Sequence, residues 1–410
     1  MSSPAHANDY APPAVVALWQ RRALLVAVPF SLAALAGWAL AYLPPGNDQF
    51  FRSYLVGFTL VLGLALGSLG LLMVYHATGG NWGTVSRRIL EAGSRTLWAV
   101  ALAFLPILIG VHRLYPWAQA ELVANDAHLQ RVGPAYLNLR LFVVRAVIYF
   151  AVWLALAWWL NRQSARLDRE PVALQQPLRS VSCPGLVAYG FTMTFAAIDW
   201  TMSLNPHWTS TIWGLLYIAG QGLIALALTA IVLARLAEHE PMKRLAGSDQ
   251  FHDLGKMILA ATMLWGWFTL SQWLIIWAGN LPEEISFYLA RTSGGWRQFN
   301  FFLVIGQFLV PFFLLLSRGL KSTPRQLAAL AVWIIFMRYW DLYWFVMPSF
   351  ADYQGHFHYS WQDAVVPIAL LSWWLYLFFG YLRRRPLVAV YDERVSLLLN
   401  QSHELEAERA

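Results

Sequence analysis

Runs of about twenty apolar residues recur along this 410-residue chain, and they constrain its fold more than any other feature. One helix needs about twenty apolar residues to cross the hydrocarbon core of a bilayer. Ten such runs are present, at residues 23–43, 54–75, 97–115, 136–160, 185–204, 209–236, 257–277, 299–316, 327–346 and 365–381. We therefore predict an all-α polytopic membrane protein with ten transmembrane helices, called spans one to ten.

Composition excludes the other broad classes of protein. With 58% hydrophobic and only 12% charged residues, the chain cannot fold as a soluble domain. A transmembrane β-barrel would show segments of about ten residues that alternate in hydrophobicity, and the long runs here do not alternate. The net charge of +7 comes from basic residues scattered through short loops. It therefore indicates membrane topology and not nucleic-acid binding.

The basic residues of the loops predict the orientation in the membrane. An even number of spans puts both termini on one side. Of the 29 Lys and Arg residues, 21 lie on the side of the termini and five on the other. The positive-inside rule then places both termini in the cytoplasm. We expect a cytoplasmic tail at 1–22, a membrane domain at 23–381 and a second cytoplasmic tail at 382–410.

The segment 197–222, AIDWTMSLNPHWTSTIWGLLYIAGQG, joins spans five and six. Its turn of about four residues, 205–208, is too short for a domain, so the two helices are expected to form a hairpin. Asp199 lies about five residues before the turn, on the order of 8 Å from the end of its helix. A carboxylate at that depth needs a partner or water. It either caps the turn and bonds a neighbouring helix, or it is a functional charge inside the bundle.

Other charged residues inside the spans share the outer half of the bilayer with Asp199. Arg145 lies in span four, and Arg338 and Asp341 share one face of span nine. Asp363 begins span ten on the same side. These charges form either a structural network of ion pairs or a polar chamber that binds a headgroup or passes protons. We expect Asp199 to pair with an arginine of another helix, Arg145 being the first candidate and Arg338 the second.

Neutral polar side chains line the inner half of the membrane. They are Ser68, Tyr189, Thr192 and Thr194, with Gln221 and Gln307 near mid-depth. His76 and Glu91 are expected at the cytoplasmic surface, where they are candidates for taking up protons. No ionisable side chain is expected well inside this half. A proton would then have to cross it along waters held by hydroxyls and amides.

Metal and haem sites are not expected in this chain. Cys183 is its one cysteine, which excludes an internal disulfide and a four-thiolate cluster. The histidines lie at span ends or in polar segments, whereas a membrane haem needs one from each of two helices. His356 and His358 have no third ligand nearby, and such a pair is more often part of a solvated loop. Electron carriers are therefore expected on partner proteins.

Three stretches resemble one family of respiratory membrane proteins. They are HATGGNWGTVSRRILEAGSRTL at 76–97, DWTMSLNPHWTSTIWGLLYIAGQG at 199–222 and SQWLIIWAGNLPEEISFYLAR at 271–291. Together they resemble the ActF-type quinol:cytochrome c oxidoreductase membrane subunits of alternative complex III. These subunits belong to the polysulfide-reductase-like (NrfD-type) family. The likeness extends over nearly the whole chain, although the first stretch alone would also suit the sister subunit.

The resemblance implies two four-helix bundles, spans two to five and six to nine, flanked by spans one and ten. It implies a complex in the bacterial inner membrane that oxidises quinol and passes electrons to a cytochrome c or an oxidase. The partners would be a multihaem cytochrome c, an iron–sulfur protein and a sister NrfD-like subunit, with lipid around them. Haems and iron–sulfur clusters would lie on these partners, and this chain would hold no covalent cofactor and no catalytic residue.

Within such a complex the polar residues become candidates for a quinone site or a proton path. They are Asp199, His207, Arg145, Arg338, Asp341 and Gln272, with His76 and Glu91 as a cytoplasmic intake. The charged members could equally serve subunit docking. The sequence does not choose among these roles.

A free-standing secondary transporter with a charged chamber in the outer half is the alternative. Ten spans and buried charges would suit it as well. Transporter sites usually use helices broken by Gly or Pro at corresponding positions of two repeats. Pro29, Pro106 and Pro311 lie within spans but not at matching places. The sequence therefore favours a subunit of a redox complex.

Overall fold

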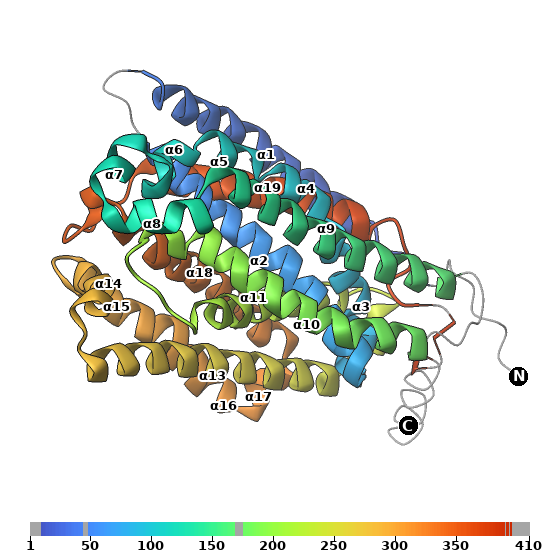
Figure 1. Cartoon of the computed structure of the whole chain (residues 1–410). Coiled ribbons are helices and arrows are strands. Elements are labelled where there is room, and N and C mark those ends of the chain that lie inside the picture. Colours follow the sequence, from blue (N-terminus) through green and yellow to red (C-terminus); the bar gives the residue numbers. More distant parts are fainter. Residues whose placement is uncertain (1–9, 44–47, 169–174, 390, 393, 396–410) are drawn as a thin grey trace, which may run out of the picture.

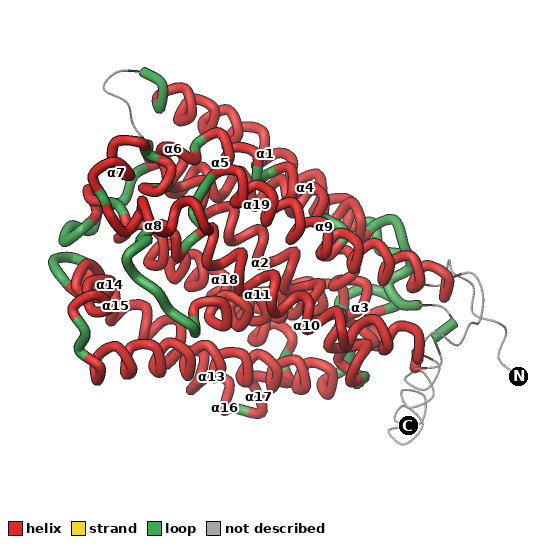
Figure 2. The backbone as a smooth tube through the Cα atoms, in the orientation of Figure 1, coloured by secondary structure: helices red, strands yellow, loops and turns green. Residues whose placement is uncertain are grey.

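The computed structural model describes residues 10–43, 48–168, 175–389, 391–392 and 394–395. Every regular element among them is a helix (Figure 2). In this part of the chain, ten helices or runs of helix are long and apolar enough to cross a membrane. The predicted all-α polytopic architecture with ten spans is confirmed.

Seven of the ten spans are single helices, and the bounds of most lie within a turn or two of the apolar runs. They are α1 (Val15–Leu40), α2 (Gln49–Thr78), α9 (Leu139–Ser164), α11 (Trp213–Leu236), α13 (Ser248–Gly279), α18 (Pro324–Val346) and α19 (Trp361–Leu382). Span five is α10 (Gln175–Trp200) followed by a short 3-10 turn, Met202–Leu204.

Spans three and eight are interrupted. Span three consists of α3 (Asn81–Ser94), α4 (Leu97–Leu102) and α5 (Leu105–Ile109), and the short helix α6 (Val111–Leu114) follows it. Span eight consists of α15 (Trp296–Leu303), a π-helical turn (Val304–Leu309) and α16 (Val310–Leu316). Short helices connect the spans: α7 (Ala120–Asn125), α8 (Ala127–Ala135), α12 (Met242–Leu245), α14 (Pro282–Thr292) and α17 (Arg318–Ser322).

The spans pack as the predicted pair of four-helix bundles. The first contains α2, α3 to α5, α9 and α10, and the second contains α11, α13, α15 to α16 and α18. The two meet where α2 packs against α11, and α1 lies along α19 at the side of the first bundle (Figure 1). The most apolar part of α2 is completely buried. This helix is therefore the centre of the assembly.

Small residues allow α2 and α11 to approach closely. A Cβ atom added to Gly67 of α2 would lie 2.1 Å from the backbone oxygen of Gln221 on α11. Such contacts are typical of membrane helices, where packing between backbones replaces the hydrophobic effect that drives folding in water.

Both ends of the described chain lie at the same end of the bundle. The backbone N–H of Leu387, after α19, donates to the carbonyl oxygen of Tyr10, before α1, at 2.8 Å. We call this the terminal end, and the opposite end, with α7, α8 and α14, the loop end (Figure 1). Leu387, Val388 and Val395 are buried, so the first part of the predicted tail 382–410 packs on the membrane domain. Residues 396–410 lie outside the described part.

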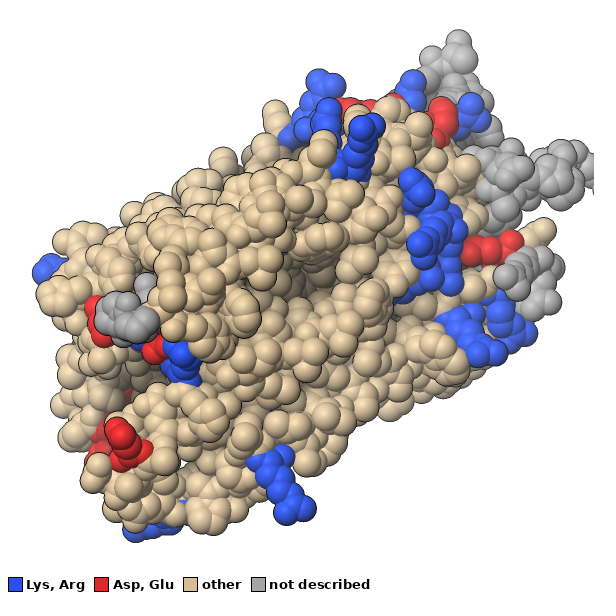
Figure 3. All heavy atoms as spheres, turned by 90° about the horizontal axis from the view of Figure 1, so that it is seen from above, with Lys and Arg blue, Asp and Glu red and all other residues tan. Residues whose placement is uncertain are grey.

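The surface between the two ends is apolar. Figure 3 shows Lys and Arg gathered mainly toward one end of the molecule, with a broad belt in which charged side chains are sparse. Leu25 of α1 and Trp267 of α13 are each 66% exposed. Side chains of this kind on the outside of a long helix fit contact with lipid.

Span three was predicted at 97–115, but its start was wrong, because the span begins at Asn81. Residues 81–94 form α3, and nearly all its side chains are buried, including Arg87, Arg88 and Glu91. Arg87, Arg88 and Glu91 lower the hydropathy of this segment, so hydropathy alone did not predict a membrane helix here. These charged side chains can be buried because they pair with each other and with the carboxylates of Asp168 and Asp392.

Candidate functional site

Asp199 and Arg145 form a bidentate ion pair near the loop end of the first bundle. Arg145 on α9 donates from Nε to Oδ2 of Asp199 at 2.8 Å and from Nη2 to Oδ1 at 2.9 Å. Tyr149, one turn further along α9, donates its hydroxyl to Oδ2 at 2.8 Å. The Asp199 side chain is completely buried. The prediction that Asp199 pairs with Arg145 is confirmed.

The backbone near this pair differs from the predicted four-residue turn. Helix α10 ends at Trp200, so Asp199 is its second-last residue, and α11 begins only at Trp213. The hydroxyls of Thr201 and Ser203 donate back to the carbonyls of Ala197 and Asp199, at 2.8 and 2.5 Å. Hydroxyl groups that bond the backbone in this way compete with helix continuation. The hairpin is correct, but the chain between α10 and α11, residues 201–212, is longer than the predicted four-residue turn and contains the 3-10 turn Met202–Leu204.

Arg338 and Asp341 form a second buried ion pair within α18. Asp341 also accepts a hydrogen bond from the indole Nε1 of Trp265 on α13, at 3.0 Å. The guanidinium fills the space beside Gly220 of α11, where an added Cβ would lie 2.1 Å from its Cζ atom. Arg338 therefore pairs with Asp341, as one interpretation of the sequence predicted, and not with Asp199.

The two ion pairs occupy related places. Helix α10 is the last span of the first bundle and α18 is the last span of the second, and each holds a buried aspartate paired with arginine. The pairing differs, because the first arginine comes from the preceding span and the second from the same helix.

A third buried carboxylate, Asp363, lies at the start of α19. Its Oδ1 atom accepts from Gln49 Nε2 and from Ser53 Oγ, both at 2.6 Å. Its Oδ2 atom caps the helix by accepting from Ser360 N–H at 2.9 Å, and Tyr343 donates to it at 3.3 Å. None of the described Lys and Arg residues forms an ion pair with Asp363. Gln49 and Ser53 were missed, although their spacing of four places them on one helix face.

At the terminal end, Glu91 lies in a buried network of ion pairs. Its carboxylate accepts from Arg87 Nε at 2.9 Å and from Arg88 Nη1 at 2.6 Å, and Arg385 lies 3.5 Å away. The hydroxyl of Ser164 also donates to it. The expectation that Glu91 lies at the surface was wrong, because its side chain is buried. Its role in taking up protons stays a prediction. Compensation by three arginines explains how Glu91 can be buried.

Two further acidic residues complete the charge balance of this network. Arg87 pairs with Asp392 at 2.9 Å, and Arg88 pairs with Asp168. Burial raises the pKa of Asp168 above its usual value, although Arg88 opposes that effect. The network ties α3, the end of α9 and the segment after α19 together.

His76 is also buried and not at the surface. It is 8% exposed, and its ring centroid lies 5.3 Å from that of Tyr75. Its Nε2 atom has no hydrogen-bond partner within the described residues.

Among the described residues, His207 and Gln272 form no hydrogen bond or ion pair with either aspartate–arginine pair and instead contact Asp126 and Ser210. His207 is an exposed residue of the α10–α11 connection, and its Nε2 atom lies 2.7 Å from Oδ2 of Asp126. Asp126 caps α8 by accepting from the backbone N–H groups of His128 and Leu129. The bond from Leu129 is the main cause that lowers the pKa of Asp126. Gln272 of α13 is buried and accepts from the Ser210 hydroxyl of the same connection.

Short hydrogen-bonded groups of polar residues lie between the two ends of the first bundle. Trp153 Nε1 donates to Thr192 Oγ1 at 2.8 Å, and the hydroxyl of Tyr189 donates to Gln221 Oε1 at 2.6 Å. Closer to the terminal end, Asn161 Nδ2 donates to Ser94 Oγ at 3.0 Å. These polar groups form separate steps and not one continuous chain of hydrogen bonds.

Arg291 is one of the five basic residues that we assigned to loops on the side opposite the termini, but it is buried. Its guanidinium donates to the backbone oxygens of Trp344 and Phe345, at 3.2 and 2.9 Å, and to Ser349 Oγ at 3.0 Å. Burial lowers the pKa of Arg291 to about 9, so the side chain is still a cation at neutral pH. It holds α14 against the end of α18, where helix carbonyls lack intrahelical donors. A charge count cannot distinguish such a residue from a solvated one.

Across the described ranges, no group of three or more His, Cys, Asp or Glu side chains could hold a metal ion. Neither the known protein-family models nor the curated proteins include a match to this sequence. The charged groups of the candidate site are the two aspartate–arginine pairs, the Asp363 cluster and the Glu91 network.

Proposed function

We propose that this chain is a membrane subunit, without a redox centre of its own, of a complex that oxidises quinol and passes the electrons to a cytochrome c or an oxidase. The complex would lie in the bacterial inner membrane, with the terminal end on the cytoplasmic side. Haem and iron–sulfur clusters would be carried by a multihaem cytochrome c and an iron–sulfur protein, next to a sister NrfD-like subunit.

The observation that carries this proposal is the position of the three stretches that resemble quinol-oxidoreductase subunits. Two of them, 199–222 and 271–291, pack against each other. The rings of Trp208 and Phe287 stack with centroids 3.9 Å apart, and Ser210 bonds Gln272. The third, 76–97, contains α3 and its buried network. The stretches 76–97 and 199–222 are largely buried, whereas 271–291 is largely exposed and is buried only at a few positions, including Gln272, Phe287 and Arg291. The resemblance therefore includes buried polar contacts as well as part of the apolar outer surface.

Within the complex, the buried polar groups support a contribution to proton movement more than a complete quinone site. The Asp199 side chain is completely buried and bonded by Arg145 and Tyr149, so a quinone headgroup could not reach it without rearrangement. Polar steps such as Tyr189 with Gln221 continue toward the Glu91 network. Waters between such steps would be needed for protons to pass.

A free-standing transporter is supported less well. Counted from the start of each bundle, span three corresponds to span seven, and span eight corresponds to span four. Span three is broken, whereas span seven is the continuous helix α13, Ser248–Gly279. Span eight contains a π-helical turn, whereas span four is the continuous helix α9. Breaks at matching places of two repeats, the usual mark of a transporter site, are not seen in the described spans.

Affinity purification in mild detergent tests the proposal. The tagged chain should copurify with proteins that contain haem c and iron–sulfur clusters, seen in the visible spectrum and by mass spectrometry. A control membrane protein with the same tag should not. Recovery of the chain alone and fully folded, with transport of a solute after reconstitution, would favour the transporter and contradict the subunit.

A further inference from the structure

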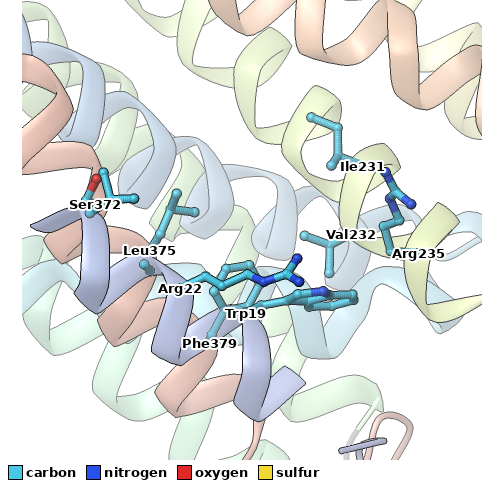
Figure 4. Close-up of a pocket in the computed structure, with 10 residues that line it drawn as sticks. Trp19, Arg22, Ile231, Val232, Arg235, Ser372, Leu375 and Phe379 are labelled. Carbon is cyan, nitrogen blue, oxygen red and sulfur yellow. The ribbon is translucent and has the colours of Figure 1, made fainter. Parts of the chain in front are cut away.

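A cavity of about 450 Å³ opens between α1, α11 and α19 near the terminal end. Figure 4 shows its lining residues: Trp19 and Arg22 from α1, Ile231, Val232 and Arg235 from α11, and Ser372, Leu375 and Phe379 from α19, with Ala23 and Val26 completing it. Val232 and Ser372 are buried, whereas Arg22 and Arg235 are exposed. The cavity thus has an enclosed floor and a basic rim.

The two rim arginines differ from those of the neighbouring network. Arg87 and Arg88 are paired with carboxylates, whereas neither Arg22 nor Arg235 has an ion pair or hydrogen bond to any described residue. They come from helices more than 200 residues apart in sequence, yet they border one cavity. Two guanidinium groups without a carboxylate attract an anion. Arginine suits phosphate in particular, because its planar fork can donate two parallel hydrogen bonds.

The rest of the cavity favours an anion that carries a long apolar part. Ile231, Val232, Leu375 and Phe379 form most of its walls, and Val26 continues the apolar surface along α1 toward the membrane interior. A free phosphate ion would contact the rim and leave these walls uncovered. An acyl chain would cover them.

The position along the helices agrees with this chemistry. Arg22 is seven residues beyond the first residue of α1, or roughly 10 Å along it at 1.5 Å per residue. Arg235 is the second-last residue of α11. Both thus lie near the depth of lipid headgroups, and Trp19 is of the residue type that favours this interface. Basic pockets between helices on the cytoplasmic side are suited to anionic lipid headgroups.

We propose that this cavity is a binding site for one anionic phospholipid, with the phosphate between Arg22 and Arg235 and an acyl chain along Leu375 and Val26. The lipid would join α1 and α19 to the second bundle through α11. This proposal does not depend on quinol oxidation.

Native mass spectrometry of the full chain, with any subunits that copurify, tests the site. The protein is purified in mild detergent and supplied with phosphatidylglycerol, cardiolipin or phosphatidylcholine. We expect one anionic phospholipid to be retained in preference to phosphatidylcholine. Arg22→Gln with Arg235→Gln should weaken its binding by at least about tenfold, because two charge-assisted contacts are lost.

Two further variants separate the site from general charge and folding effects. Arg21→Gln with Lys243→Gln removes the same charge from exposed residues outside the cavity and should change binding by less than about twofold. Leu375→Trp fills the apolar part without changing charge and should also reduce binding. Size-exclusion chromatography checks that all variants fold.

Three results would overturn the proposal. Retention of phosphatidylcholine to the same extent as the anionic lipids would show that the arginines do not select the headgroup. Displacement of the bound species by millimolar inorganic phosphate would identify a soluble anion. Cross-linking of Arg22 or Leu375 positions to a copurified protein, with no lipid retained, would show that a subunit covers the cavity.

Discussion

The guanidinium of Arg145 holds both carboxylate oxygens of Asp199, at 2.8 and 2.9 Å, across the adjacent helices α9 and α10. Asp199 is completely buried, and the Arg145 side chain is 17% exposed. A buried pair of this geometry is costly to break from one side, because the remaining charge has no partner.

We predict that Asp199→Asn lowers the stability of the protein by about 3 kcal/mol. Asp199→Asn combined with Arg145→Gln should recover part of this loss, since neither charge is then left unpaired. Thermal unfolding in detergent, followed by fluorescence, measures both. Asp253→Asn, in an exposed pair with Lys256, is the matched control and should have little effect. A double variant no more stable than the single one would show that the pair does not act as a unit.

Gly220 provides the space for the Arg338 guanidinium, and we predict that Gly220→Ala destabilises the protein by about 2 kcal/mol. The added methyl group would displace Arg338 and disturb its pair with Asp341. Gly222→Ala, two residues along the same helix, is the control, because nothing lies within 4 Å of a Cβ added there. Alanine favours helix over glycine, so Gly222→Ala should be neutral or stabilising. Similar melting temperatures for both variants would contradict the close contact at Gly220.

Arg291→Met should destabilise the loop end by about 3 kcal/mol, because it leaves the backbone carbonyls of Trp344 and Phe345 without their guanidinium donor. Faster hydrogen exchange in α14 and at the end of α18 is the expected local sign. Arg297→Met removes an exposed arginine of the same segment and should leave exchange unchanged. Equal effects of both substitutions would mean that Arg291 contributes only charge.

The cap of α8 should depend on pH through Asp126. The hydrogen bond from Leu129 N–H lowers the pKa of Asp126 in the folded state. The stabilisation by this carboxylate is therefore fully present above pH 3.8, the usual pKa of aspartate. It is lost as the pH falls through the lower pKa of the folded state. We expect amide exchange in α8, corrected for intrinsic rates, to accelerate below that window. Asp126→Asn keeps a capping oxygen but does not titrate, so its exchange should not show this change. If amide exchange in α8 accelerates at the same pH in Asp126→Asn, a group other than Asp126 causes the change.

Hydropathy was sufficient to predict the ten spans, because each span requires a long apolar run, whereas the grouping into two bundles was implied by the family resemblance. The Asp199–Arg145 pair also followed from the sequence, since both residues lie at similar depth on consecutive spans. Hydropathy failed at α3, where Glu91 and its arginines are buried only because they meet Asp168 and Asp392 from distant parts of the chain.

Contacts between distant segments also explain the other omissions. The sequence around Gln49 and Ser53 gives no sign of a cluster, because their partner Asp363 comes from the distant helix α19. The burial of Arg291 could not be predicted from its own segment, because its acceptors lie at the end of α18. His207 was named with Asp199 as a candidate for a quinone site or proton path, but it is an exposed residue of the connection after α10 and contacts Asp126.

Quinol oxidation by membranes tests the proposed function most directly. Membranes are prepared from the source organism with the gene for this chain deleted, and from the same strain carrying the wild-type, Asp199→Asn or Asp253→Asn chain. We predict that deletion abolishes quinol-dependent reduction of the electron acceptor, that the wild type and Asp253→Asn restore it, and that Asp199→Asn restores only part of it. Undiminished quinol oxidation in the deletion strain, with the haem and iron–sulfur proteins still assembled, would contradict the proposal that this chain is a subunit of the quinol-oxidising complex.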